Sequence, residues 1–505
     1  MTGPKGKRSP FPFHVFLAAA YPSLALLASN LSEVSVNVVY RPLLISLGLG
    51  LVFLFLSWLV MRNLQRAALV ASLFIILFFS YGHIYPLLKG INLDGIFLFR
   101  HRTLLVLWVL IGLAGAWFFR GKKLALESIT STLNLVTLVL VLMPLVQVIY
   151  PTVRNAITEA QVAQPEPEPT PVVSGQSAPD IYYIILDAHG RTDILKEHAG
   201  FDNSDFIHSL EELGFYVGRC SQTNYSLTLL SIASSLNYTY IDDLMGESGG
   251  VDLQYYLSKS AIRKFLEARG YKTVAFATGF RMTQLTDADY YYEPGTQKDN
   301  EFEAQLLKTT AWIALVDAGI APEMDSSAEN YRDRTLLVLD TLRELPDLEG
   351  PKFVFAHIAS PHPPYIFDAQ GNFHDVGLGE HDEKNLAPQD MAPLYREQVA
   401  FIDNQILDVV RTILEKSKTP PVIIIQGDHG PLVIDKSIRM PILNAYYLPR
   451  GQALLYPSIS PVNTFRVVLD AWFGQSLPLL EDISLFSIDY RTPFDYRNVP
   501  NTCEK

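Results

Sequence analysis

The stretch VIIIQGDHG, residues 422–430, joins four consecutive β-branched residues to a cluster of polar ones. A short apolar run of this kind is typical of a strand that is buried on both faces, as in a parallel sheet. Gly427 and Gly430 permit tight turns of the backbone on either side of Asp428 and His429. Ligands of open α/β sheets bind at the carboxyl ends of the strands, which is where the acid and the imidazole stand.

Two other apolar runs end in polar residues in the same way. IYYIIL, residues 181–186, is followed directly by Asp187. KFVFAHI, residues 352–358, contains His357 and is followed by His362 in the motif HIASPHPPY. Helical patterns alternate with these runs, at residues 203–213, 224–237, 261–269, 331–344 and 391–417. The alternation predicts an α/β domain with a mostly parallel central sheet that helices cover on both faces.

Two carboxylates and an imidazole are a ligand set that suits a divalent cation. We therefore predict that Asp187, Asp428 and His429 bind one metal ion, with Zn²⁺ or Mn²⁺ favoured and Mg²⁺ or Ca²⁺ as alternatives. Other histidines are candidates for a second metal or for contacts to the ligands and the substrate, and no spacing selects among them: His189, His357, His374 and His381.

The sequence CSQTNYSLTLLSIASSLN, residues 220–237, offers a hydroxyl nucleophile at the start of a predicted helix. Thr223 precedes that helix, where backbone N–H groups and the positive end of the helix dipole can hold a phosphate. Coordination to a metal would activate its hydroxyl. We predict Thr223 as nucleophile and additional metal ligand, with Asn224 close to the substrate. Alternatives to Thr223 are Ser221, Ser226 and Thr228, of which the last two lie inside the predicted helix.

The first third of the chain has the pattern of a membrane domain. Five apolar segments are each close to the length that crosses a bilayer, at Phe11–Leu27, Leu43–Val60, Ala67–Leu88, Thr103–Phe119 and Leu133–Tyr150. Basic residues precede the first segment, separate the second from the third, and separate the fourth from the fifth. Because cytoplasmic loops carry such an excess of Lys and Arg, we expect a multi-pass protein of the cytoplasmic membrane with everything after Tyr150 outside. The segments contain almost no ionisable residues, which argues against a transporter.

Charge also divides the chain. Residues 1–155 carry 13 Lys and Arg against 3 Asp and Glu, whereas the rest carries 27 against 49. The acidic second region argues against a nucleic-acid partner. Residues 156–179 are rich in Pro and Glu and predict a tether between the membrane domain and a catalytic domain at 180–505. Cys220 and Cys503 would form one disulfide in an oxidising compartment or remain two thiols.

These features resemble membrane-anchored enzymes of the alkaline phosphatase superfamily, namely lipoteichoic acid synthases, phosphoethanolamine transferases and related sulfatase-like proteins. The resemblance covers nearly the whole chain. It rests on the acid in ILDAHGR (Asp187), the Thr in QTNYS (Thr223), the Asp-His pair in GDHG (Asp428 and His429) and the His in PHPPY (His362). It implies a metal-dependent enzyme in which Thr223 attacks phosphorus and His362 contacts the substrate phosphate.

The sequence departs from these families at two points. The synthases and transferases usually have Glu at the position of Asp187. Sulfatases need a Cys or Ser in a CxPSR-type motif, whereas SQTN follows Cys220. We therefore expect transfer or hydrolysis of a phospho-ester through a covalent phospho-threonine intermediate, with a lipid or envelope glycan as substrate. The alternatives are a sulfatase-like sulfuric ester hydrolase or phosphodiesterase, and a non-catalytic envelope assembly protein. The oligomeric state stays open.

Overall fold

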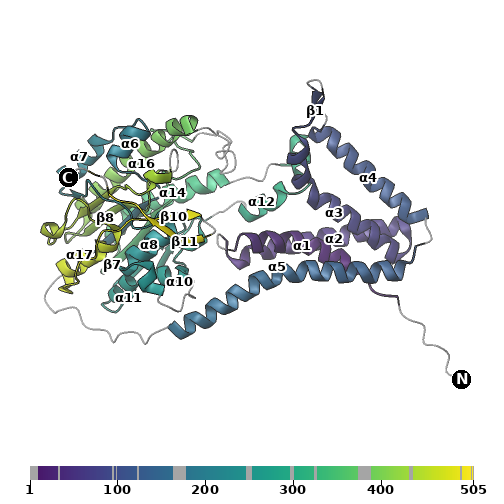
Figure 1. Ribbon diagram of the computed structural model, residues 1–505, viewed down its shortest axis with the longest axis horizontal. Coiled ribbons are helices and arrows are strands. Elements are labelled where there is room, and N and C mark those ends of the chain that lie inside the picture. Colours follow the sequence, from purple (N-terminus) through teal and green to yellow (C-terminus); the bar gives the residue numbers. More distant parts are fainter. Residues whose placement is uncertain are drawn as a thin grey trace. The chain divides into compact units, whose positions relative to one another are not determined.

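The computed structural model describes the chain from residue 9 to residue 503, except for residues 32–33, 94–95, 98, 122–123, 163–177, 246–252, 296–300, 323–326, 374–387, 432–435, 490–491 and 502. His374, His381 and most of the expected tether lie outside the described residues. The chain divides into two compact units (Figure 1). We call Met1–Arg154 with Gln297–Ser326 the membrane unit, and Asn155–Thr296 with Ser327–Lys505 the sheet unit.

Apolar helices dominate the membrane unit. In chain order they are α1 (His14–Ser29), α2 (Tyr40–Met61), α3 (Leu64–Leu88), α4 (His101–Gly121) and α5 (Leu126–Val162). The last four are long and apolar enough to cross a membrane, whereas α1 has 16 residues and is shorter than a typical span. A small hairpin, β1 (Asn92–Leu93) and β2 (Ile96–Phe97), lies between α3 and α4. The expected set of apolar amino-terminal helices is thus confirmed.

A segment from the middle of the chain packs on these helices. It contains α12 (Glu301–Lys308) and α13 (Trp312–Asp317). In sequence these helices follow β6 (Tyr290–Tyr292) and precede α14 (Ser327–Glu344), which both belong to the sheet unit. The N–H of Gly82 in α3 donates to the carbonyl of Thr309 at 2.9 Å. A Cβ atom at residue 82 would lie 2.2 Å from the carbonyl oxygen of Lys308, so this close approach of two backbones requires glycine.

The sheet unit is organised around a seven-stranded sheet in the order β4-β9-β8-β3-β7-β5-β6. The strands β3 (Ile181–Leu186), β5 (Lys272–Phe276), β6 (Tyr290–Tyr292), β7 (Lys352–Ile358) and β8 (Val422–Gly427) are parallel. At one edge, β9 (Asn444–Tyr447) and β4 (Tyr216–Val217) are antiparallel to their neighbours. The three central strands β8, β3 and β7 are buried on both faces, as their continuous apolar sequences predict.

Helices cover both faces of this sheet. One face packs on α7 (Ser204–Glu212), α14 (Ser327–Glu344) and α16 (Pro388–Lys416), through side chains that include Leu210, Leu339 and Ile402. The other packs on α8 (Thr228–Asn237), α11 (Ala261–Glu267) and α17 (Pro461–Phe473), through Leu236, Ile262 and Phe465 among others. The shorter helices α6 (Thr192–His198), α9 (Ile241–Met245) and α10 (Leu253–Ser258) complete the unit. The expected α/β architecture with a mostly parallel sheet is confirmed.

The carboxyl-terminal part of the chain is bonded to the loop that precedes α8, through hydrogen bonds and a disulfide. A separate antiparallel hairpin, β10 (Leu485–Asp489) and β11 (Thr492–Asn498), bonds to this loop: the N–H of Leu485 donates to Asn224 O at 2.8 Å. A disulfide between Cys220 and Cys503 fixes the start of the same loop to residues near the end of the chain. Of the two states left open by the sequence, the disulfide is the one observed.

Candidate metal centre and nucleophile

Side-chain alternation brings the predicted acids onto one face of the sheet. Successive residues of a strand point to opposite faces, so Asp187 shares the face of Tyr183 and Asp428 shares that of Gln426. The hydroxyl of Tyr183 donates to Oε1 of Gln426 at 2.6 Å, so these two side chains, and with them Asp187 and Asp428, lie on the same face of the sheet. The parallel register of β3 and β7 gives His357 the same orientation. This is the face that α8 covers.

Asp187, His357 and Asp428 converge on one point. Their ligand atoms lie within 4.8 Å of one another, and all three side chains are buried. Oδ1 of Asp187, Nε2 of His357 and Oδ2 of Asp428 have no hydrogen-bond partner within the described part of the chain. Nε2 of His357 lies 3.2 Å from Oδ2 of Asp187. Buried polar atoms without partners are costly, so their convergence indicates a ligand between them.

His429 joins this cluster through its ring geometry. Its Nδ1 atom lies 2.8 Å from the carbonyl oxygen of Gly430, and a carbonyl only accepts, so Nδ1 carries the proton when the ring is neutral. Burial, followed by the positive charge of Arg439, lowers the pKa of His429 and favours this neutral ring. Nε2 then carries the lone pair, and it lies 3.5 Å from Oδ1 of Asp187 and 3.6 Å from Oδ2 of Asp428. Lone pairs that face one another fit a divalent cation.

Nearby histidines lower the pKa of Asp187. Burial alone would raise its pKa, yet the pKa lies well below the usual range of Asp because His362 and His357 stabilise the carboxylate. The carboxylate is therefore ionised and ready to bind a cation at neutral pH.

Backbone geometry supports the same centre. Ala188 has a φ of 65°, an uncommon value for a residue with a side chain, and its N–H donates to Oδ1 of Asp428 at 3.0 Å. A Cβ atom at residue 427 would lie 2.4 Å from His189 O, and one at residue 430 would lie 2.6 Å from Ile438 O. The two glycines of GDHG are thus required by close packing around the acid and the imidazole.

His362 lies at the border of the centre. It is half-buried, its ring centroid is 6.5 Å from that of His429, and its charge acts on Asp187. Its carbonyl oxygen accepts hydrogen bonds from the hydroxyl of Tyr331 at 2.7 Å and from Nε2 of Gln398 at 3.0 Å. These bonds fix the backbone of the loop while the imidazole remains accessible.

The loop that leads into α8 crosses the segment next to GDHG. The N–H of Thr223 donates to Met440 O at 2.7 Å, and the N–H of Gly430 donates to Arg439 O at 2.6 Å. The helix itself begins at Thr228 rather than at residue 224, because the loop backbone bonds to distant segments instead of to the helix. The amino-terminal end of α8 therefore lies at the carboxyl end of the sheet.

The four candidate hydroxyls of this loop differ in their surroundings. Thr223 is 0% exposed, and its Oγ1 atom donates to Tyr225 O at 3.0 Å and lies 2.9 Å from the hydroxyl of Ser231. Ser221 donates to the carbonyl of Ile459, and Ser226 accepts from the N–H of Ser487. Thr228 is half-buried, and its hydroxyl makes no hydrogen bond to another described residue. Of the four, only the hydroxyl of Thr228 is both accessible and uncommitted in the described structure.

Helix geometry relates Thr228 to the acids. Ser235, seven residues further along α8 and on the same helix face, lies with its hydroxyl 2.7 Å from that of Tyr183. Thr228 is displaced from Ser235 by about 10 Å toward the start of the helix. Asp187 is displaced from Tyr183 by about 13 Å toward the carboxyl end of the strand. Because the amino-terminal end of α8 lies at the carboxyl end of the sheet, both displacements run toward that end. Thr228 is therefore at about the same height above the sheet strands as Asp187, on the face of α8 that carries Ser235.

Two other residues named from the sequence have structural contacts. The side chain of Asn224 donates to the hydroxyl of Ser460 at 3.0 Å and accepts from the N–H of Val462 at 2.8 Å, which ties the loop to α17. Both ring nitrogens of His189 have partners, Gly190 O at 3.0 Å and Oδ1 of Asp403 at 2.8 Å. Of the three additional candidates, only His357 enters the cluster.

The sequence alone did not single out two residues near the centre. The hydroxyl of Thr283 lies 3.0 Å from Nδ1 of His357 and orients that ring. Arg439 places a buried positive charge near His429. Neither residue lies in a recognisable motif. Arg439 follows GDHG by nine residues, and this closeness in sequence is the one signal that could have suggested it.

Comparison with known families agrees with this geometry. The sulfatase family model matches residues 217–461, a range that contains α8, β7, β8 and the cluster residues His357, Asp428 and His429 but not Asp187. Residues 217–461 are a sulfatase-family domain. This domain belongs to the alkaline phosphatase superfamily, whose enzymes are transferases and hydrolases. Four described helices that precede it in the chain are long and apolar enough to cross a membrane. A search of curated protein sequences finds no match.

Several solved structures share features of the sulfatase-family domain. The carboxyl-terminal periplasmic domain of EptC from Escherichia coli, in complex with Zn, aligns at 13% identity over 62% of this chain and 90% of its own, with a TM-score of 0.43. Lipooligosaccharide phosphoethanolamine transferase A from Neisseria meningitidis aligns at 11% identity over 92% and 95%, with a TM-score of 0.38. A sulfatase-annotated protein of Bacteroides thetaiotaomicron aligns at 13% identity over 60% and 72%, with a TM-score of 0.37. These similarities carry no argument about the chemistry of this chain.

Proposed function

We propose that this chain transfers a phospho-ester group at the outer surface of the cytoplasmic membrane through a covalent phospho-threonine intermediate. The observation that supports it most is the convergence of four buried side chains, Asp187, His357, Asp428 and His429. The first three each have a ligand atom without a hydrogen-bond partner among the described residues. A non-catalytic envelope assembly protein would not need to keep such a complete set of metal ligands, so the cluster disfavours that alternative.

The nucleophile of the proposed reaction is Thr228. The sequence favoured Thr223, whose hydroxyl has two partners in the interior, whereas Thr228 begins α8 with an accessible hydroxyl. At this position the backbone N–H groups of the first helical turn and the helix dipole stabilise the phosphoryl oxygens. The Thr228 oxygen attacks phosphorus, the bond to the leaving alcohol breaks, and the alcohol takes up a proton. An acceptor hydroxyl then attacks the phospho-threonine and restores the enzyme.

The ligands of the proposed cation are Asp187, Asp428, His429 and His357. Carboxylate and imidazole donors in this number favour Zn²⁺ or Mn²⁺ over Mg²⁺ or Ca²⁺. Such an ion, when bound, supplies positive charge that lowers the pKa of a hydroxyl and neutralises phosphoryl oxygens. The role of the protein is to hold the Asp187 carboxylate ionised and the His429 ring neutral, which the lowered pKa of each of these two groups supports.

Two further side chains are suited to the charge on the substrate. His362 is half-buried beside the cluster, and its Nδ1 atom lies 2.7 Å from Pro363 O, so Nδ1 carries the proton of the neutral ring. In the doubly protonated ring, Nε2 donates to a phosphoryl oxygen. Arg439 adds a buried positive charge near His429. Preorganised donors of this kind stabilise developing charge in a transition state.

Sulfuric ester hydrolysis of the usual kind is disfavoured by Cys220. Its sulfur is bonded to Cys503, so it is not available for conversion to a formylglycine. Hydrolysis of a phosphodiester by the same residues remains the second candidate, because water in place of the acceptor hydroxyl would complete the reaction. The membrane helices favour a lipid or an envelope glycan as donor or acceptor.

The experiment uses the full chain in detergent with bis(p-nitrophenyl) phosphate as a soluble donor. Release of p-nitrophenol should require Zn²⁺ or Mn²⁺ and stop after chelation. Fragment-ion mass spectrometry of the quenched enzyme should find the added phospho group on Thr228. Turnover without any protein adduct would mean direct attack by water and would exclude the covalent intermediate.

A further inference from the structure

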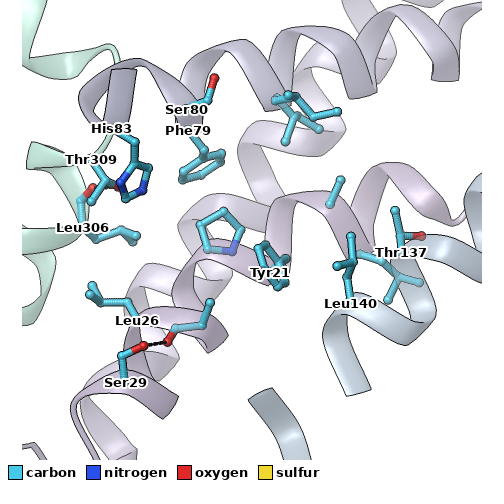
Figure 2. A pocket seen from close by; sticks show the side chains of 16 residues that line it. Tyr21, Leu26, Ser29, Phe79, Ser80, His83, Thr137, Leu140, Leu306 and Thr309 are labelled. Atoms are coloured by element: carbon cyan, nitrogen blue, oxygen red, sulfur yellow. Dashed lines mark hydrogen bonds between the residues drawn. The ribbon is translucent and has the colours of Figure 1, made fainter. Parts of the chain in front are cut away.

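The membrane unit contains a pocket of about 520 Å³ among its helices. It is lined by side chains of α1, α3 and α5 and closed at one end by the inserted segment, through Leu306 and Thr309 (Figure 2). The lining is mostly apolar, and the volume is in the range of pockets that hold a ligand of moderate size. All of these residues belong to the membrane unit.

The two ends of the pocket differ in polarity. His83 and Thr309 lie beside each other at one end, whereas Leu140 and Thr137 lie at the opposite end (Figure 2). The hydroxyl of Thr137 is satisfied by Leu133 O at 2.7 Å, and that of Thr309 by Leu306 O at 2.7 Å. The imidazole of His83 makes no hydrogen bond to any residue that the structure describes. Because His83 is exposed at this end, its ring nitrogens are available to a ligand that enters the pocket.

The pocket has the length of one leaflet. Between Ile75 and His83, α3 rises by about 12 Å, and between Leu17 and Ser29, α1 rises by about 18 Å. Half of a hydrocarbon core measures about 15 Å. In the proposed orientation α1, α3 and α5 all run outward, so the polar end lies at the outer interface and the apolar end near the middle of the membrane.

We infer that this pocket binds one hydrocarbon chain of the lipid substrate, with His83 donating a hydrogen bond to an oxygen at the top of that chain. The inference rests on the proposed function and adds to it the place where the lipid is held. The segment that closes the polar end comes from between β6 and α14 of the sheet unit in sequence. The same stretch of chain that contacts the lipid is thereby continuous with the sulfatase-family domain.

The test uses the full chain in phosphatidylcholine nanodiscs that contain phosphatidylethanolamine with a diazirine on one acyl chain. Irradiation should label pocket residues of α1, α3 and α12. Ala18→Phe and Ala25→Phe each place a ring into the pocket from α1 and should lower this labelling by about tenfold. Ala114→Phe, the same change on an exposed position of α4 outside the pocket, should leave it unchanged.

Activity is measured on the same variants with a lipid donor and with bis(p-nitrophenyl) phosphate. The two pocket variants should lose turnover of the lipid and keep that of the soluble ester. His83→Leu should raise KM for the lipid by about tenfold with kcat retained, and His83→Gln should restore part of the loss.

Three results would separate the possibilities. Equal labelling in Ala18→Phe, Ala25→Phe and Ala114→Phe would overturn the inference, because the label would come from lipid around the protein. Loss of labelling with unchanged lipid turnover would overturn the substrate role and leave a structural lipid. Pocket-specific labelling in an enzyme that turns over neither ester would support the lipid site and refute the proposed function.

Discussion

Nε2 of His429 lies 3.5 Å from Oδ1 of Asp187, while the other nitrogen of the same ring is engaged by the carbonyl of Gly430. A neutral imidazole in this tautomer directs a lone pair at Oδ1 of Asp187, a carboxylate oxygen that has no donor among the described residues. Two acceptors held this close in the interior are unfavourable by themselves. A cation bound between them would turn this unfavourable approach of two acceptors into a pair of metal–ligand bonds.

Metal binding should depend on these ligands and should stabilise the fold. Asp428→Asn and His429→Ala are expected to abolish stoichiometric Zn²⁺ or Mn²⁺ in elemental analysis, whereas His208→Ala, a change at an exposed histidine, should retain it. At a hundred times its dissociation constant the ion should add about 2.7 kcal/mol to the stability of the wild-type chain, seen as a higher Tm. Full metal content in both ligand variants would remove these residues from the metal site.

The nucleophile can be identified by two matched substitutions. Thr228→Ala should lower the rate by at least about 10³-fold, since the covalent route is lost, and Thr228→Ser should keep partial activity. Thr223→Ala removes two buried hydrogen bonds and should cost about 1–3 kcal/mol of stability while activity at low temperature is retained. The opposite result, an inactive but stable Thr223→Ala and an active Thr228→Ala, would return the role to Thr223.

The sequence predicted the ends of the central strands better than it predicted the start of α8. The strand ends were visible because Asp187 and Asp428 follow short, wholly apolar runs that could only be buried strands. The start of α8 was not, because the preceding loop is held by Leu485, about 260 residues away, whose N–H bonds to Asn224. A local pattern contains no information on such a distant partner, and it placed the helix start at residue 224.

The inserted segment was hidden from the sequence for a related reason. Residues 301–317 are amphipathic and lie between elements of the sheet unit, so nothing in their composition assigns them to the membrane helices. Their contact depends on the absence of a side chain at Gly82. The orientation of His357 toward Asp187 was similarly beyond the sequence, because it follows from the register of β3 and β7.

The disulfide should contribute to the stability of the sheet unit. It joins residues 283 positions apart and so restricts the unfolded chain strongly. The double variant Cys220→Ser, Cys503→Ser should unfold with a free energy lower by about 2–5 kcal/mol, measured in denaturant with the oxidised wild type as reference. The reduced wild type should match the variant. Equal stability of the oxidised and reduced wild type would contradict this prediction.

Topology can be measured with reporters that work only after export. A fusion after Thr152 should be active, since the proposed orientation puts the end of the last membrane segment outside. A fusion after Arg62, in the short basic connection between α2 and α3, should be inactive and serves as the control. Activity after Arg62 together with silence after Thr152 would invert the orientation and the side on which the sulfatase-family domain is proposed to work.

The inserted segment meets α3 at Gly82. A valine at this position would bring its Cβ atom to 2.2 Å from the carbonyl oxygen of Lys308, and neither backbone can yield without moving the segment. The hydrogen bond from the N–H of residue 82 to Thr309 O would be lost with the contact. Gly82→Val should therefore expose residues 301–317 and open the polar end of the pocket.

The expected readouts are faster tryptic cleavage after Lys308 and a fall of about tenfold or more in turnover of a lipid donor, with bis(p-nitrophenyl) phosphate turnover nearly unchanged. Gly48→Val is the matched control, because a Cβ atom at residue 48 of α2 would have no neighbour within 4 Å among the atoms described. If Gly82→Val and Gly48→Val turn over the lipid equally while only the former is cleaved at Lys308, the segment is displaced without consequence, and closing the pocket is not its function.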